Sequence, residues 1–280
     1  MIYPDRMPPK DTPVWWIIVH DNHLVDTGQL EENFQPPFLP VEEIPFADYA
    51  YTAEIGEYQG SPVFLLIRDE SMKLLNGWNN VPLRQCILRG DNELFSLGAR
   101  ACQITGFLQT HKYCGTCGEE VAQDREELAV VCGHCGLVSY PRISPCIIVG
   151  IYKEDKILLA QGIRHPEGLH SVLAGFVESG ESLEQCLHRE VFEEAGIEVT
   201  DLEYVGSQPW PFPHSLMAGF IARYASGELT LAPDELVAGG WFSFDDLPNM
   251  PPPGSIAWKL IEAVRKKVQG ELTDSTQRTW

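Results

Sequence analysis

Three glutamates stand at the spacing that brings side chains together on one face of a helix. Glu190, Glu193 and Glu194 are residues i, i+3 and i+4 of an acidic stretch, residues 175–197. On a helix their carboxylates lie side by side, repel one another and raise one another's pKa. A cation removes that repulsion, and hard carboxylate oxygens select Mg²⁺ or Mn²⁺. The neighbouring Arg189 can orient a carboxylate through a bidentate pair. The spacing predicts a divalent-metal site; a solvated acidic helix is the alternative.

The helix that must carry these side chains is expected from Ser182 to Ala195. Ser179 or Ser182 can cap its start, and Gly196 supplies a C-terminal stop. An apolar stripe at i, i+4 and i+8 would bury the opposite side of the helix. Its residues are Leu183, Leu187 and Val191.

A second constellation consists of four cysteines in two C-x-x-C pairs. These are Cys114, Cys117, Cys132 and Cys135. Four thiolates at this spacing suit one tetrahedral Zn²⁺, and a redox pair is the alternative. Because every position is a cysteine, the zinc site is closed, so we expect a structural ion that takes no part in catalysis.

Three domains are expected, and together they give an α+β fold. Residues 1–110 combine short β-type runs with a helix over 94–111 and predict a small α+β domain. Residues 111–140 hold the cysteines and predict a zinc ribbon. Residues 141–270 predict an α/β/α sandwich that begins with two strands joined at Glu154-Asp155, continues through strands broken by prolines and ends with a helix at about 255–268. Residues 271–280 form a tail.

Composition narrows the function classes. The formal charge of −20 and the pI of about 4.7 disfavour loose binding to long nucleic acid, which requires clustered Lys and Arg. No apolar run reaches the roughly 20 residues that span a bilayer, and the start lacks a signal-peptide pattern. We therefore expect a cytoplasmic protein with no membrane partner.

The glutamates belong to a longer pattern. Gly175, Glu181 and residues 189–197 match G-x5-E-x7-R-E-U-x-E-E-x-G-U at every defined position. The sequence therefore resembles the Nudix hydrolases, which cleave nucleoside diphosphates linked to another group. The stretch SQPWPFPHS, residues 207–215, and the cysteine ribbon upstream resemble the branch of NADH pyrophosphatases that also remove NAD caps from RNA. The resemblance covers residues 15–268, firmly after His111 and loosely before it.

The resemblance implies a role for individual residues. Glu190, Glu193, Glu194, a later Glu235 and the carbonyl of Ala174 would bind two or three Mg²⁺ or Mn²⁺ ions. Arg189 would complete the catalytic set, and Glu194 would orient or deprotonate the attacking water, or serve only as a ligand. Tyr140 and Phe176 would flank the nicotinamide ring. The rest of the substrate pocket would be formed by Gln208, Pro209, Trp210, Pro211, Phe212, Pro213, His214, Ser215 and Ala257, with a looser match at Arg84.

The implied reaction is hydrolysis of NAD(H) to AMP and nicotinamide mononucleotide, and of NAD-capped RNA to 5′-monophosphate RNA. The family forms homodimers, so a homodimer is expected. One alternative is a Nudix hydrolase for another dinucleotide such as ADP-ribose. The other is a zinc-ribbon nucleic-acid-binding regulator without catalysis, but the intact glutamate set argues against it. The charge of −20 indicates that the cap and first nucleotides would dominate binding to RNA.

Overall fold

The structure is a computed structural model that describes residues 8–20, 23–28, 34–44, 52–68, 73–88, 92–124 and 126–270. The predicted tail, 271–280, lies outside these residues. The chain divides into two units by the contacts within it. The N-terminal unit is Met1–Ile143 with Pro211–His214, and the C-terminal unit is Ser144–Trp210 with Ser215–Trp280.

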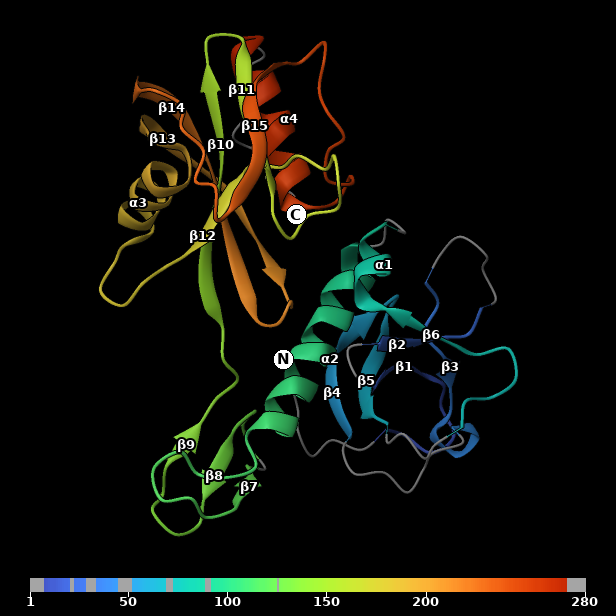
Figure 1. Ribbon diagram of the computed structural model, residues 1–280. Helices are drawn as coiled ribbons and strands as arrows, with labels where there is room; N and C mark the ends of the chain where they lie inside the picture. The colour runs from blue at the N-terminus through green and yellow to red at the C-terminus, as the bar shows by residue number, and fades with distance from the viewer. Residues whose placement is uncertain are drawn as a thin grey trace. The chain divides into compact units, whose positions relative to one another are not determined.

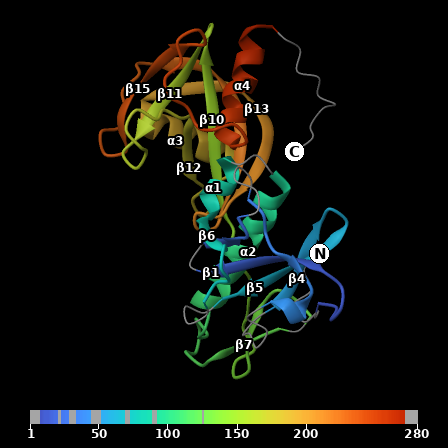
Figure 2. The ribbon, with the colours of Figure 1, turned by 90° about the vertical axis from the view of Figure 1, so that its right-hand side faces the viewer.

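A mixed sheet and a long helix form most of the N-terminal unit. Its elements are β1 (Val14–His20), β2 (His23–Asp26), β3 (Phe38–Leu39), a 3-10 turn η1 (Val41–Glu43), β4 (Thr52–Tyr58), β5 (Ser61–Ile67), β6 (Asn79–Pro82), α1 (Leu83–Leu88) and α2 (Asn92–Thr110). The strand order is β4-β5-β1-β2-β6, with β3 paired to β1. Helix α2 packs against β1 and β4, as Figure 2 shows. The expected α+β character and the helix expected over 94–111 are confirmed.

The cysteine module follows α2 and forms a small sheet of its own. Strands β7 (Val121–Gln123), β8 (Val130–Cys132) and β9 (Val138–Ser139) pair antiparallel in that order. Two tight turns, one before β7 and one before β9, carry the C-x-x-C pairs.

The C-terminal unit is built on a second mixed sheet. Its elements are β10 (Ser144–Lys153), β11 (Lys156–Gly162), β12 (Leu173–Phe176), α3 (Leu183–Ala195), β13 (Ile197–Trp210), β14 (Ser215–Gly227), β15 (Leu236–Ser243) and α4 (Ile256–Val268). The order is β13-β14-β10-β11-β15, and β12 pairs with β10. The strand pair expected around Glu154-Asp155 is confirmed, since β10 and β11 are antiparallel with Lys153 opposite Lys156.

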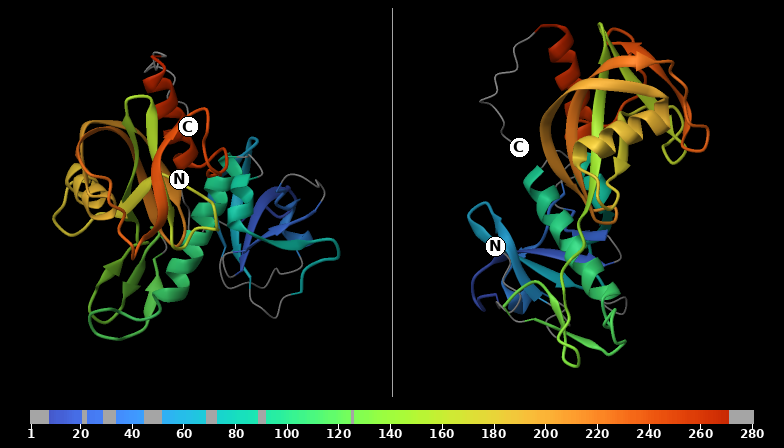
Figure 3. Two further views of the ribbon diagram at one scale, coloured as in Figure 1. Left: turned by 45° about the horizontal axis from the view of Figure 1, so that its top comes forward. Right: turned by 90° about the vertical axis from the view of Figure 1, so that its left-hand side faces the viewer.

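Alternation along β10 gives this sheet two buried faces. Ile147 and Val149 belong to the core cluster under α3, whereas Ile148 belongs to the cluster under α4. Figures 1 and 3 show α3 and α4 on opposite sides of the sheet. The α/β/α sandwich is confirmed. None of the helices in the described residues is long and apolar enough to cross a membrane.

The prolines of residues 207–215 affect the strands less than expected. Strand β13 continues through Pro209, which lies opposite Leu216 of β14. Because β13 is the edge strand of the sheet, the missing N–H of Pro209 is tolerated there. The prediction that prolines break the strands is therefore wrong at Pro209, and the break lies at the turn Pro211–His214.

Candidate active site

The ends of α3 are defined by specific contacts. The Ser182 hydroxyl accepts a hydrogen bond from the backbone N–H of Gln185, and the Gln185 side chain accepts one from the backbone N–H of Ser182. This reciprocal capping box satisfies two amide groups that a helix start leaves unpaired. Gly196 closes the helix in the left-handed conformation, with φ of 68°. The predicted start at Ser182 and stop at Gly196 are confirmed.

The three helix glutamates differ in exposure. Glu194 is buried, with 5% of its surface exposed, and the Glu190 side chain is 13% exposed. Glu193 points outward and its side chain is 58% exposed. The carboxyl groups of Glu190 and Glu194 are therefore held in a largely desolvated place, where a negative charge is costly unless a partner compensates it.

Arg189 is the guanidinium partner of this group. It donates two parallel hydrogen bonds to the Glu181 carboxylate, from Nε at 2.6 Å and from Nη2 at 2.9 Å. Its Nη1 donates to Glu190 and to Glu193, each at 2.9 Å, and Nη2 also donates to the Phe176 carbonyl at 3.0 Å. The predicted bidentate pair exists, but with Glu181 rather than with a helix glutamate. The sequence prediction left Glu181 out of the site, although its fixed spacing to Arg189 is a signal for this pair.

The pKa shifts of the carboxylates reflect their surroundings. Burial, together with the charges of Glu235, Glu190 and Glu193, raises the pKa of Glu194 to about 8. The pKa of Glu190 is raised as well, chiefly by burial. Hydrogen bonds from Arg189, by contrast, lower the pKa of Glu181 to about 2. Glu181 is therefore an ionised carboxylate paired with Arg189, whereas Glu190 and Glu194 are destabilised when they carry a negative charge.

The donor set fits a hard divalent cation. Oxygen ligands from several carboxylates are the ligands that Mg²⁺ and Mn²⁺ prefer. The Glu190 carboxylate also occupies the space that a side chain at Gly175 would fill, since an ideal Cβ there would lie 1.9 Å from Glu190 Cδ. Gly175 thus leaves room for a carboxylate against strand β12. The neighbouring Ala174 lies in β12 opposite Ile148 of β10.

Glu235 joins this group from a distant part of the chain. It directly precedes β15 and its charge raises the pKa of both Glu190 and Glu194, so its carboxylate acts on theirs. All four predicted metal-binding glutamates therefore act on one another through their charges, whereas among the described residues only the cysteines lie close enough together to match the spacing of metal ligands.

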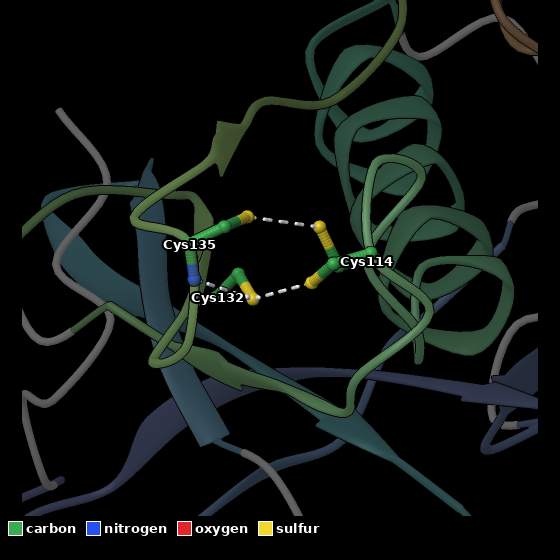
Figure 4. A group of neighbouring side chains, drawn as sticks. Cys114, Cys132 and Cys135 are labelled. Carbon is green, nitrogen blue, oxygen red and sulfur yellow. Dashed lines mark hydrogen bonds between the residues drawn. The ribbon is translucent and has the colours of Figure 1, made fainter.

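The four cysteines form a compact cluster, of which Figure 4 labels Cys114, Cys132 and Cys135. Their sulfurs all lie within 4.8 Å of one another, with 3.5 Å between Cys114 and Cys135 and between Cys117 and Cys132. A tetrahedron with Zn–S bonds of about 2.3 Å has edges of about 3.8 Å, so the cluster fits one zinc ion. Backbone N–H groups of Cys117 and Thr116 lower the pKa of Cys114 to about 6, and the pKa of Cys132 is lowered too, whereas hydrogen bonds to neighbouring thiols and burial raise the pKa of Cys117 and of Cys135. A bound zinc ion would hold all four as thiolates. The residues support the predicted structural zinc site.

The two predicted stacking rings are both accessible. Phe176 at the end of β12 is 53% exposed, and Tyr140 after β9 is 57% exposed. The Tyr140 hydroxyl donates a 2.8 Å hydrogen bond to Glu127, which raises the pKa of Tyr140. Tyr140 lies in the N-terminal unit and Phe176 in the C-terminal unit, and their joint action on one ring stays a prediction. No sequence signal pointed to Glu127.

Both the nitrogen and the oxygen of the Gln208 side-chain amide are hydrogen-bonded to the backbone. Its Nε2 donates to the Gly254 carbonyl at 3.0 Å, and its Oε1 accepts from the backbone N–H of Ile256 at 2.8 Å. Gln208 thereby ties β13 to the start of α4, where Ala257 is buried in the core. Gln208, which was predicted to line the pocket, thus holds the backbone of Gly254 and Ile256 next to Ala257.

The remaining predicted pocket residues lie in and around the β13–β14 turn. Ser215 is buried and Trp210 is partly buried against the α4 core, whereas Pro209 and Pro213 are exposed. Pro211 is buried and His214 is half-buried. Within the N-terminal unit, the Arg84 guanidinium lies 4.6 Å from the centre of the half-buried Phe212 ring. The loosely matched Arg84 therefore contacts a predicted pocket residue.

Comparison with known proteins agrees with this architecture. Residues 142–264 match the sequence profile of the NUDIX domain, and residues 109–140 match that of the NADH pyrophosphatase zinc ribbon domain. Over 265 residues the chain is 44% identical to the NAD-capped RNA hydrolase NudC of Escherichia coli O81, covering 92% of this chain and 95% of that protein. It is 43% identical to the protein of the same name from Escherichia fergusonii over the same coverage. A NUDIX hydrolase from Nitrosomonas europaea is 22% identical, with a TM-score of 0.46 over 56% of this chain and 90% of that chain.

A Nudix sheet with a glutamate-bearing helix, preceded by a four-cysteine ribbon, defines a Nudix hydrolase of the NADH pyrophosphatase type. Within that class, the identity and coverage show that the chain belongs to the NudC family.

Proposed function

We propose that this chain hydrolyses the pyrophosphate bond of NAD(H) to AMP and nicotinamide mononucleotide, and removes the NAD cap from RNA to leave a 5′-monophosphate end. The observation that carries the proposal is the set of glutamates around Glu194. Burial and the charges of three other glutamates raise the pKa of Glu194 to about 8. The names of the relatives support the choice of substrate, since both are called NAD-capped RNA hydrolases.

The carboxylates would hold two or three Mg²⁺ or Mn²⁺ ions. We assign the ligands to Glu190, Glu193, Glu194 and Glu235, with the carbonyl of Ala174. When bound, such ions neutralise the charge of the pyrophosphate and lower the pKa of water. Two of the side chains that would hold them, Glu190 and Glu193, are already oriented by hydrogen bonds from Arg189.

Glu194 is the residue that we assign to the attacking water. Its buried carboxylate would accept the water proton while a new P–O bond forms and the bridging P–O bond breaks. The electron pair of the broken bond leaves with the second phosphate. We keep Arg189 in the catalytic set as the residue that would hold the helix glutamates in place, since it donates to Glu181, Glu190 and Glu193.

Tyr140 and Phe176 would recognise the nicotinamide end of the substrate. Both rings are more than half exposed, so a flat ring can stack on either of them with little reordering. Residues 208–215, Ala257 and Arg84 would form the rest of the pocket. Because the chain carries a charge of −20, binding to capped RNA would depend on the cap and first nucleotides.

We further propose that the zinc is structural and that the protein is a cytoplasmic homodimer. The distribution of the cysteines, four in the two C-x-x-C pairs and the others scattered along the chain, fits a reducing compartment better than a disulfide framework. Sedimentation equilibrium tests the dimer: we expect twice the chain mass of 31.4 kDa, and a monomer at micromolar concentration would refute this part of the proposal.

Product analysis on four substrates tests the function. Purified protein is incubated with NADH, NAD⁺, ADP-ribose and NAD-capped RNA, with and without Mg²⁺. We expect metal-dependent release of AMP from NADH and of 5′-monophosphate RNA from the capped RNA. A preference for ADP-ribose would instead identify a different Nudix hydrolase, and no hydrolysis with either Mg²⁺ or Mn²⁺ would favour the non-catalytic regulator.

A further inference from the structure

The segment Leu229–Glu235, called here the anchor loop, makes up all but the first residue of the connection from β14 to β15 and ends at the fourth glutamate of the site. Glu235 itself is exposed and lies far along the chain from α3. Some feature of the fold must therefore hold this loop at a defined distance from the helix glutamates.

The anchor loop is hydrogen-bonded to the C-terminal end of α3. The backbone N–H of Thr230 donates to the Ala195 carbonyl, and that of Ala232 donates to the Glu194 carbonyl, both at 2.9 Å. These are two of the carbonyls that a helix leaves unpaired at its end. The main chain of Glu194, whose side chain lies in the site, is thus bonded directly to the loop that ends at Glu235.

The other end of the loop is held as well. The N–H groups of Glu235 and Leu236 both donate to the Ala232 carbonyl, at 3.2 and 2.9 Å. The Glu235 carbonyl accepts a 2.9 Å bond from Ile163, next to the irregularity in the pairing of β11 with β15. The anchor loop is therefore held at both ends, by backbone hydrogen bonds to α3 at its start and by a turn and the bond from Ile163 at Glu235.

Gly196 lies where the loop approaches the helix most closely. An ideal Cβ at Gly196 would lie 3.2 Å from the Glu228 carbonyl oxygen and 3.3 Å from Thr230 Cβ. At Gly227, on the loop side, a Cβ would lie only 2.7 Å from the Gly196 oxygen. Any side chain at position 196 must push the anchor loop away from α3 by a few tenths of an ångström.

We propose that Gly196 is a positioning residue for Glu235: by lacking a side chain, it lets the anchor loop dock on the end of α3 and sets the distance between the Glu235 carboxylate and those of Glu190 and Glu194. This inference rests on the proposed function, in which these carboxylates share divalent ions. It assigns to Gly196 a role separate from ending the helix, which requires only its left-handed φ of 68°.

The two roles can be separated by the choice of side chain. Asn adopts the left-handed conformation more readily than other residues, so Gly196→Asn keeps the helix end but adds a Cβ against the loop. Gly60 is a matched control, with φ of 76° and no atom within 4 Å of an ideal Cβ. Gly60→Asn introduces the same side chain in the same backbone conformation, remote from the loop in sequence.

The experiment measures Mn²⁺ binding by the zinc-loaded, full-length protein without substrate, from the electron paramagnetic resonance signal of free Mn²⁺. We expect Gly196→Asn to weaken the tightest Mn²⁺ site about 10-fold, the size typical of a lost outer-shell support, and Gly60→Asn to leave it unchanged. In a Glu235→Gln background, Gly196→Asn should cause no further loss, because it acts through Glu235.

A second variant keeps the test informative if Gly196→Asn fails to fold. Leu231 is partly buried against the core under α3, so Leu231→Ala loosens the anchor loop without altering the helix end. Leu231→Ala should also weaken Mn²⁺ binding. In the Glu235→Gln background it should cause no further loss.

The possible results separate the inference from the function on which it rests. Parental affinity in both loop variants, or losses that persist in the Glu235→Gln background, would overturn the positioning role alone. A parent protein that binds no Mn²⁺ would overturn the proposed function and the inference with it.

Discussion

Glu194 differs from the other glutamates of α3 in being almost fully buried, with 5% of its surface exposed. We expect Glu194→Gln to lower kcat for NADH at least about 100-fold, the scale of a lost acid–base or metal-binding group. Steady-state assays with saturating Mg²⁺ measure this loss. The exposed Glu198→Gln on β13 is the control. Parental kcat in Glu194→Gln would remove Glu194 from the mechanism.

The same residue makes stability depend on pH. Burial and neighbouring glutamates raise the pKa of Glu194 from 4.5 to about 8. A raised acid pKa favours the protonated form in the folded state, so this contribution to stability is full below about pH 4.5 and is lost as the pH rises through 8. In metal-free buffer at pH 8.5, Glu194→Gln should therefore melt higher than the parent.

Each kcal/mol of that gain corresponds to about 2–4 °C in Tm for a unit of this size. Melting curves at pH 5 and pH 8.5 provide the comparison, with the difference between variant and parent expected mainly at the higher pH. An equal difference at both values would show that the Glu194 carboxyl is not destabilised by its charge.

Tyr140 controls the choice of substrate in our proposal. Stacking of a ring is worth about 1–3 kcal/mol by alanine substitution, so Tyr140→Ala should lower kcat/KM for NADH roughly 5- to 150-fold. ADP-ribose has no nicotinamide and should be affected far less. Tyr140→Phe keeps the ring but loses the hydroxyl that contacts Glu127, and it should retain most of the activity on NADH. Equal losses on both substrates would assign Tyr140 to the fold or the dimer.

Helix α3 depends on its capping box. Removing the Ser182 hydroxyl deletes the acceptor for the Gln185 amide, and such a loss costs about 1 kcal/mol. We expect Ser182→Ala to lower the free energy of unfolding by about this amount while Mg²⁺-saturated kcat stays within about twofold, a change of under 1 kcal/mol in the barrier. Urea titration checks the first part. Ser179→Ala is the matched control, because Ser182 occupies the cap position.

Local patterns allowed α3 and its carboxylates to be predicted from the sequence. The cap, the left-handed glycine and the i, i+3, i+4 spacing all act within a few residues, so the sequence contains them directly. The strands of the sandwich could be predicted for the same reason, apart from the course of β13 through Pro209, which depends on its place at the sheet edge.

Contacts between distant residues were not predictable in this way. Gln208 binds the backbone of Ile256, 48 residues away, and Tyr140 binds Glu127 in another strand connection. The family resemblance named Gln208 and Tyr140 but gave no reason for their position. The docking of the anchor loop on α3 likewise involves backbone groups, which any sequence provides and which therefore leave no pattern.

At the scale of the whole molecule, the zinc cluster should matter for folding and not for chemistry. Four cysteine sulfurs within 4.8 Å of one another predict one zinc per chain, independent of Mg²⁺ or Mn²⁺. Elemental analysis of protein purified without chelators checks the stoichiometry, and finding no zinc would refute it. Cys114→Ser should reduce stability or assembly, while the fraction that stays folded and zinc-loaded keeps its kcat.

The contact between Glu190 and Gly175 has a consequence for genetic variation. An added Cβ at position 175 would lie 1.9 Å from the Glu190 carboxyl carbon, whereas Gly133 has no atom within 4 Å of such a Cβ. Every glycine codon begins with GG, and any change of either base that still encodes an amino acid adds a side chain. In a saturation library selected for hydrolysis, codon 175 should therefore retain only its silent third-base changes, while codon 133 should accept alanine and serine.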